Sequence, residues 1–385
     1  NATNYIERVI GNQDIRISGT GDYLEFSGSY PNHSKYVYVE VQPGFETPNY
    51  LDEAGNIRNA SFTASLPYHI SGGFESGSDG TVVHPIGFYE NAVTTNIQGF
   101  ANPYNNGYKR ILDLLKNQDE YDINMIMMPG IYADDSAGGA TTINYALDVC
   151  EDRGDCFVIA DVAPYRTAQS TAITTADGFD SNYGAFYYPW VQIQDSATNT
   201  MRWVPPSTVL GGVFAFNDKV AHPWFAPAGL NRGGIDNAIQ TEKKLTHANR
   251  DELYEANINP IASFPGQGVC VWGQKTLQRK ASALDRVNVR RLMIKLKKFI
   301  ASSSRFLVFE QNNAATRNRF LNIANPYMEQ VQTNSGLTAF KIVMDDSNNT
   351  PDVVDRNILY GQIFVQPTRT AEFIVLDFTI QPTGA

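Results

Sequence analysis

The sequence is poor in cysteine and has no long apolar run. Its 385 residues include only Cys150, Cys156 and Cys270, and no two of them form a CxxC motif. Three cysteines cannot all pair, which argues against a secreted disulfide framework and favours assembly in a reducing compartment. No apolar stretch approaches the roughly 20 residues of a membrane span, so membrane insertion is not expected.

The sequence also lacks the short motifs that mark common enzyme chemistry. It contains no GxxxxGK[ST], GxGxxG, HExxH or GxSxG. The five histidines are scattered without the spacing of a metal-ligand pair, so no metal and no cofactor are expected. Asp134 and Asp161 follow predicted buried strands, where α/β enzymes place catalytic groups. A hydrolase using these two aspartates is the alternative to a non-enzymatic role.

Composition predicts a folded chain of two or three domains. Hydrophobic residues make up 42% and charged residues 18% of the sequence, which excludes a disordered chain. The net charge of −10 is unevenly distributed. Residues 1–240 contain 12 basic and 27 acidic side chains, whereas residues 241–385 contain 18 and 13. This asymmetry suggests that different parts of the surface meet different partners.

The hydrophobic pattern predicts an α+β multidomain fold with three regions. Residues 1–104 are expected to be β-rich, with a strand over residues 36–41. Residues 105–240 alternate helices with apolar strands, which predicts an α/β domain with a mainly parallel sheet. Its predicted elements are helices at 108–115, 143–150 and 207–221, and strands at 122–128, ending at Pro129-Gly130, and 156–161.

Residues 241–385 are expected to form a further α+β domain. The pattern predicts strands at 268–272, 306–309, 358–366 and 371–380, and helices at 285–301 and 314–332. The last strand is apolar on both faces. Such a strand belongs either to its own domain or to the sheet of another subunit, and the pattern alone favours the first. Its apolar residues are Phe373, Ile374, Val375, Leu376, Phe378 and Ile380.

The helix predicted at 285–301 separates apolar from cationic residues. At about 100° per residue, one face is an apolar stripe and the other carries six cations. No acidic residue occurs from Arg286 to Arg305. Solvated helix faces usually mix charges of both signs, so this face indicates an acidic partner, either a protein surface or nucleic acid. The six cations are Arg286, Arg290, Arg291, Lys295, Lys297 and Lys298.

An ordered series of motifs in the last 170 residues resembles a known family. Residues 258–261 read INPI, residues 263–268 read SFPGQG, and VWG follows at 271–273, with later segments VNVRRL, VFE and AEF. The series resembles the C-terminal domain of contractile tail sheath proteins, most closely those of T4-like phages. Gln274-Lys275 stands where relatives carry Ala-Arg. The motif residues are Pro260, Phe264, Pro265, Gly266, Gly268, Trp272 and Gly273; the prolines and glycines are expected to set a rigid turn, and Trp272 to anchor the core.

This resemblance implies a structural subunit of the phage virion, not an enzyme. Sheath subunits of the family form hexameric rings that stack helically around a tail tube, between a baseplate and a tail terminator. They are assembled in the host cytoplasm in a metastable extended state, and contraction drives the tube through the host envelope. No nucleic-acid partner and no cofactor are implied. The alternative that the residues leave open is a nucleic-acid-binding module built on the cationic helix.

The resemblance also implies a role for two candidate segments. The C-terminal domain lies innermost in the family, so the cationic helix is expected to face the tube, and residues 1–104 to belong to an outer domain. Terminal strands are exchanged between neighbouring subunits, which favours the strand at 373–380 as an inter-subunit strand. The chain begins at Asn1, not Met, and shows no signal-peptide pattern. We therefore expect it to be part of a longer protein that includes the family's N-terminal arm.

Overall fold

The computed structural model describes residues 5–17, 23–41, 107–134, 138–196 and 199–372. The chain divides into two compact units, Asn1–Val83 and His84–Ala385, which are described separately. The described part of the first unit contains helix α1 (Ile6–Ile10) and an antiparallel hairpin of β1 (Asp14–Ile17) and β2 (Leu24–Ser27). The predicted strand at 36–41 is wrong. Tyr36 and Tyr38 are exposed there, and no strand lies beside them among the described residues.

A five-stranded sheet organises the second unit, and it is mainly parallel as predicted. Its order is β10-β9-β5-β4-β3, in which only the β9–β10 pair is antiparallel. The strands are β3 (Met125–Tyr132), β4 (Phe157–Asp161), β5 (Gly184–Tyr188), β9 (Ile258–Phe264) and β10 (Gly268–Val271). The predicted end of the first strand at Pro129-Gly130 is wrong. The register shifts there, Gly130 adopts φ +96°, and the strand continues to Tyr132.

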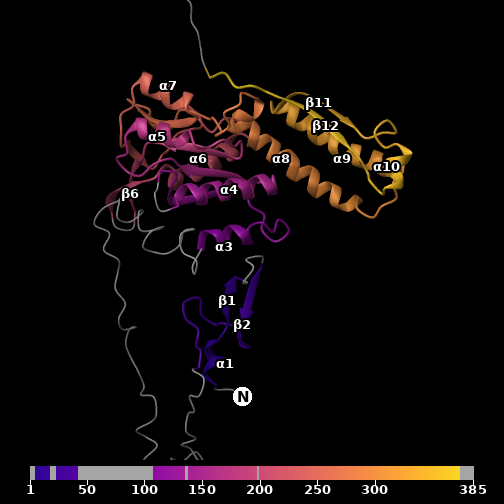
Figure 1. Cartoon of the computed structure of the whole chain (residues 1–385), viewed down its shortest axis with the longest axis horizontal. Coiled ribbons are helices and arrows are strands. Elements are labelled where there is room, and N and C mark those ends of the chain that lie inside the picture. Colours follow the sequence, from indigo (N-terminus) through magenta and orange to yellow (C-terminus); the bar gives the residue numbers. More distant parts are fainter. Residues whose placement is uncertain (1–4, 18–22, 42–106, 135–137, 197–198, 373–385) are drawn as a thin grey trace, which may run out of the picture. The chain divides into compact units, whose positions relative to one another are not determined.

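Helices cover both faces of this sheet (Figure 1). Alternate residues of β4 and β5 face opposite sides, as the period of two requires. One side packs against α3 (Gly107–Leu114), α4 (Gly139–Arg153), α5 (Gln169–Ala176) and α7 (His247–Glu255). The other packs against α6 (Pro206–Val220) and the first half of α8 (Val287–Ser304). The helices predicted at 108–115, 143–150 and 207–221 are confirmed as α3, α4 and α6.

A second, smaller sheet and a helical layer complete the unit. The sheet is antiparallel, with order β7-β6-β8, and consists of β6 (Val191–Asp195), β7 (Thr200–Val204) and β8 (Ala238–Thr241). Further along the chain, α9 (Ala314–Thr333) packs against the β11–β12 ribbon, formed by β11 (Leu337–Val343) and β12 (Gln362–Pro367). The short elements are α10 (Pro351–Asp355) and the 3₁₀ turns Ala283–Asp285 and Arg305–Leu307.

The described C-terminal residues differ from the sequence expectation at several points. The strand predicted at 306–309 is a 3₁₀ turn, and Phe306 and Phe309 are exposed with no strand beside them in the described part. Strands β9 and β11 and helices α7 and α10 were not predicted. The strand predicted at 268–272 exists as β10, but it joins the sheet of the α/β region, so this sheet crosses the expected domain boundary at 240/241. Of the strand predicted at 371–380, the structure describes only residues 371 and 372, which are not in a strand. Its other residues lie outside the described residues.

Two glycines provide a test of this packing. A Cβ on Gly184 in β5 would lie 2.4 Å from Leu147 Cδ2 inside the core, whereas Gly212 on the exposed side of α6 has open space. We expect Gly184→Ala to lower the free energy of unfolding by about 1–3 kcal/mol through overpacking. Gly212→Ala should raise it by about 0.5–1 kcal/mol, because alanine favours the helix. Urea unfolding of both variants measures the difference, and equal effects would contradict the described core.

Candidate functional site

Helix α8, the predicted cationic helix, connects two hydrophobic cores. Val287 and Ile294 pack into the core on the α6 side of the sheet. Leu292 and Leu296 pack with α9 and β11 in a separate cluster that also contains Trp224. Figure 1 shows the helix extending beyond the sheet, with α9 and the β11–β12 ribbon beside its outer half. The predicted apolar stripe is therefore confirmed, and it fixes which cations can reach solvent.

Arg291 is buried and forms an ion pair with Asp218, whose side chain is 33% exposed. Its guanidinium donates from Nη1 to Oδ1 of Asp218 at 2.8 Å and from Nη2 to Oδ2 at 2.6 Å. It also lies over the ring of Phe214, 4.8 Å from the ring centre. Only 7% of the Arg291 side chain is exposed. This bidentate contact joins α8 to the C-terminal turn of α6, which is a structural use of the charge.

Arg290 is buried as well. Its guanidinium lies 4.0 Å from the ring centre of Tyr183 and donates to Asn182 Oδ1. Its Nε has no hydrogen-bond partner among the described residues. Burial lowers the pKa of Arg290, and Tyr183 and the charge of Glu151 offset the lost water only in part. The contact with a π face partly replaces that water.

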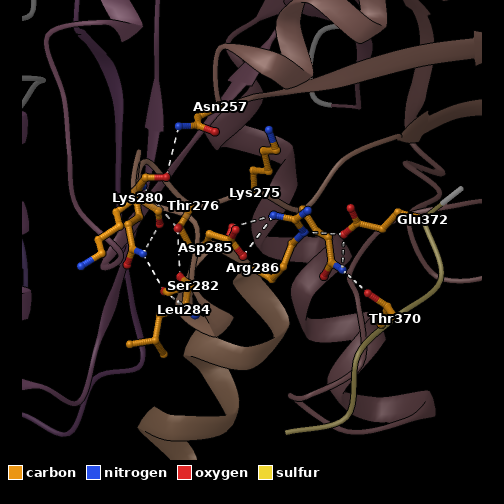
Figure 2. A network of polar contacts seen from close by, with 12 residues as sticks. Asn257, Lys275, Thr276, Lys280, Ser282, Leu284, Asp285, Arg286, Thr370 and Glu372 are labelled. Carbon is orange, nitrogen blue, oxygen red and sulfur yellow. Dashed lines mark hydrogen bonds and ion pairs between the residues drawn. The ribbon is translucent and has the colours of Figure 1, made fainter.

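Arg286 binds carboxylates just before the start of α8, and Lys298 binds one in the second half of the helix. Lys298 Nζ donates to Asp122 at 2.5 Å and to the carbonyl of Ile123 at 2.6 Å, and its charge lowers the pKa of Asp122. Arg286 Nε donates to Glu372 at 2.7 Å, and its Nη1 lies 3.1 Å from Asp285 (Figure 2). Four of the six predicted cations therefore contact polar groups of their own chain.

Lys295 and Lys297 are the remaining two cations of α8. Both are exposed and have no hydrogen bond or ion pair within the described ranges. They line a groove of about 1180 Å³ between α8, α9 and the loops around residues 118–124 and 153–155. Six cations and four aspartates line this groove. The aspartates pair with the other four cations: Asp119 with Arg305, Asp122 with Lys298, Asp155 with Arg153, and Asp218 with Arg291. The two lysines are its uncompensated charge.

The expectation of an exposed face with six cations is thus wrong for Arg290 and Arg291. The helix alone contains no acid, but the acids come from distant segments. Asp218 lies 73 residues before Arg291, and Asp122 lies 176 residues before Lys298. A helical projection cannot detect such pairs. The structure reduces the candidate surface for a partner to Lys295 and Lys297, with Lys298 and Arg286 half-buried beside their carboxylates.

Of the two aspartates considered for catalysis, Asp161 has a structural role. Asp161 ends β4 and is fully buried, where it accepts hydrogen bonds from the backbone N–H of Ser207 at 2.9 Å and from its hydroxyl at 2.5 Å. Both donors belong to the first turn of α6, so Asp161 anchors that helix to the sheet. Burial raises the pKa of Asp161 to about 7. Asp134 uses its backbone N–H to bond Val162, and the described residues contain no cluster of three metal-ligating side chains.

The motif residues form the β9–β10 hairpin and the segment after it. Gly266 and Gly268 adopt φ +73° and +80° around the turn, as expected for glycines that set a turn. Pro260 instead lies inside β9, buried and paired with Tyr188 of β5. Trp272 is 41% exposed and packs on Phe264 beside the hairpin, so the prediction of a core anchor is wrong. The motif's remaining members are Phe264 and Pro265 at the turn and Gly273 after β10.

Gly273 shows why this motif requires small residues. A Cβ there would meet Asn259 Oδ1 at 2.9 Å and Tyr254 at 3.0 Å. The same Asn259 side chain forms hydrogen bonds with both backbone polar groups of Lys275. It accepts from the Lys275 N–H at 2.6 Å and donates to the Lys275 carbonyl at 2.8 Å. The close packing at Gly273 and the two Asn259 hydrogen bonds thus fix the backbone path between β10 and α8.

Three other expectations concern the last predicted strand, membrane insertion and the cysteines. The apolar strand residues Phe373, Ile374, Val375, Leu376, Phe378 and Ile380 lie outside the described residues. Among the helices that the structure describes, none is both long and apolar enough to cross a bilayer. Cys150, Cys156 and Cys270 are all buried and free.

The buried carboxyl of Asp161 predicts a pH effect on stability. Its pKa is about 7 in the folded chain against 3.8 when unperturbed, so the folded state holds an extra proton between these values. Stability should therefore fall as pH rises from 4 to 7, by at most about 1.4 kcal/mol per pH unit from this group. Asp161→Asn should remove that slope while keeping both contacts to Ser207, and Asp134→Asn should leave it. Urea unfolding from pH 4 to 8 measures this, and an unchanged slope in Asp161→Asn would contradict it.

The Arg291–Asp218 pair predicts a loss of stability on truncation. Arg291→Ala should lower the free energy of unfolding by about 2–3 kcal/mol, because Asp218 loses its partner at a site that is only partly open to water. Arg356→Ala is the matched control, since its pair with Asp352 is largely exposed. It should cost less than about 1 kcal/mol. Equal losses, again by urea unfolding, would show that the Arg291 pair is not structural.

Comparisons with known proteins identify the family. A family model for the phage tail sheath protein central domain matches residues 105–277, and one for the phage tail sheath C-terminal domain matches residues 279–381. The tail sheath protein of Vibrio phage KVP40 is 32% identical over 303 residues, and that of Enterobacteria phage T4 is 31% identical over 291 residues. Each alignment covers 71% of this chain and 44% of the relative. The chain thus spans less than half the length of these curated relatives.

Solved structures share the fold. The sheath complex of the extracellular contractile injection system PVC, in its contracted state, matches with a TM-score of 0.59 at 24% identity, over 70% of this chain and 75% of that chain. A chain of the anti-feeding prophage baseplate structure matches with a TM-score of 0.60 at 22% identity, and the match covers 80% of this chain and 84% of that chain. Tail sheath proteins are structural proteins and not enzymes, which removes the basis for a hydrolase. The two matched domain models and the phage relatives together show that this chain belongs to the phage tail sheath family.

Proposed function

We propose that this chain is part of a subunit that polymerises as hexameric rings around a tail tube. In this proposal the rings assemble in the host cytoplasm between a baseplate and a tail terminator, in an extended high-energy state. Contraction to a second packing then drives the tube through the host envelope. The observation that carries the proposal is the match of both sheath domain models, one after the other, along residues 105–381. The three buried, free cysteines are compatible with assembly in a reducing compartment.

The groove beside α8 is the proposed contact with the tube. Its only uncompensated charges in the described part are Lys295 and Lys297, which would attract an acidic surface. Exposed ion pairs are worth about 0.2–1 kcal/mol each. Repeated over many subunits, such contacts hold an extended sheath on its tube and still release together during contraction. The buried cations of α8 cannot serve in this way, because they already bind their own chain.

The β11–β12 ribbon supports the proposed strand exchange. In the described part of the chain, β11 and β12 pair only with each other, so each has an outer edge without a strand. A two-stranded ribbon is marginal by itself and gains stability from further strands. The apolar segment at 373–380 has the composition of such a strand, and main-chain hydrogen bonds would give it affinity for a neighbour's ribbon.

The alternative of a nucleic-acid-binding module has less support than the sequence suggested. Binding to phosphates needs several unpaired cations on one surface. Arg286, Arg291 and Lys298 already bind carboxylates, and Arg290 is buried against Tyr183. Two lysines are a small footprint for a nucleic acid, whereas they suffice for a contact repeated in every subunit of a polymer.

Charge reversal at the groove tests the tube contact. In the full-length protein, Lys295→Glu with Lys297→Glu should abolish extended sheath on tubes but spare tube-free polymer, because only the attraction to the acidic tube is reversed. Lys244→Glu with Lys280→Glu changes the net charge equally at other exposed positions and should assemble normally. Negative-stain electron microscopy with purified tubes gives the readout. Normal extended sheath from the groove variant would refute the tube contact.

A further inference from the structure

Glu372 is held by donors from three separate segments. Its Oε1 accepts from Arg286 Nε at 2.7 Å and from Gln274 Nε2 at 3.0 Å, and its Oε2 accepts from the Tyr254 hydroxyl at 2.8 Å. Gln274 Nε2 also donates to Thr370 Oγ1 at 2.6 Å, so two residues of this segment are fixed. Figure 2 shows Arg286 between Asp285 on one side and Glu372 on the other. Only 17% of the Glu372 side chain is exposed.

The three donors stand on a rigid frame. Tyr254 belongs to α7, Gln274 follows β10, and Arg286 immediately precedes α8. The backbone of the last two segments is paired, because Val287 N–H donates to the Gln274 carbonyl at 2.8 Å and residues 275 and 286 form a bridge. Their positions therefore do not depend on the segment that they hold.

The carboxylate of Glu372 lies 2.7 Å from Arg286 Nε, closer than that of Asp285, which lies 3.1 Å from Nη1. Lys275 is a further cation nearby, and the charges of Asp285, Glu372 and Glu255 all act on it. Lys275 lies over the Tyr254 ring, 4.7 Å from its centre, and burial together with the charge of Arg286 lowers the pKa of Lys275. Burial and the neighbouring Glu372 raise the pKa of Tyr254, so its hydroxyl remains a donor. Removing Glu372 would take from Arg286 the shorter of its two ion pairs.

We infer that these three donors form a clamp on Glu372 that fixes where the C-terminal segment leaves the folded chain. The inference rests on the proposed strand exchange. Strand β12 ends at Pro367, and the Thr368 N–H still bonds the Gly336 carbonyl, so without the clamp the segment would be free four residues before Glu372. A longer, freer tether lowers the effective concentration of the strand at its acceptor, and fixing it reduces the ordering cost of exchange. The clamp also passes tension in the strand to α8 and the sheet.

The test uses assembly of the full-length protein. Glu372→Ala should raise the critical concentration for polymer formation at least about tenfold, from the loss of charge-assisted hydrogen bonds. Tyr254→Phe removes one donor and should raise it less. Glu310→Ala, which removes an exposed carboxylate 3.7 Å from Arg319, is the control and should leave it unchanged. Melting of the unassembled subunit should shift by only a few degrees in each variant.

Charge exchange separates positioning from folding. The double variant Glu372→Arg with Arg286→Glu should assemble better than Glu372→Arg alone but below wild type, since it restores the ion pair in reverse while Gln274 and Tyr254 lose their acceptor. This gain would also support the clamp if Glu372→Ala alone failed to fold, whereas a folded double variant that assembles no better than Glu372→Arg would overturn it.

Deletion of residues 373–385 distinguishes the two proposals. Normal assembly of the deletion variant would refute strand exchange itself. Lost assembly on deletion, with normal assembly of Glu372→Ala, would refute the clamp and leave strand exchange standing.

Discussion

The ion pair between Arg291 and Asp218 sets the position of α8, and the rest of the C-terminal half depends on that helix. Through this pair α8 is fixed to α6, which covers one face of the parallel sheet. On its other side the same helix packs with α9 and the β11–β12 ribbon. A change in the pair would therefore alter the relation of two hydrophobic cores, not just one surface contact.

The cations of one helix serve two purposes that differ in energy. Arg286, Arg291 and Lys298 bind carboxylates of the same chain, and the buried Arg290 binds Asn182 and the Tyr183 ring. Breaking such a buried contact is costly. Lys295 and Lys297 lie exposed on the groove, where each contact with a partner is weak and screened by salt. A subunit that must stay folded while its assembly changes state needs this separation. Strong contacts keep the body rigid, and weak ones are free to be exchanged.

Local pattern predicted what depends on local sequence. Periodicity identified α3, α4, α6, α8 and α9, and the apolar runs identified β3 and β4. It missed strands β5 to β9 and β11 and helices α5 and α7. It misjudged residues 306–309, because an apolar run becomes a strand only where a neighbouring strand pairs with it. It also could not foresee that Arg290 and Arg291 are buried. Asn182 and Asp218 lie 108 and 73 residues away from them, and only the fold brings them together.

The most direct test is a cryo-electron microscopy map of the full-length protein assembled around its tube, with side chains visible along α8. The account predicts that Lys295 and Lys297 lie within about 4 Å of acidic groups of the tube, the usual limit for an ion pair. Arg290 and Arg291 should keep their partners Asn182 and Asp218. A map in which the groove beside α8 faces away from the tube would contradict the account.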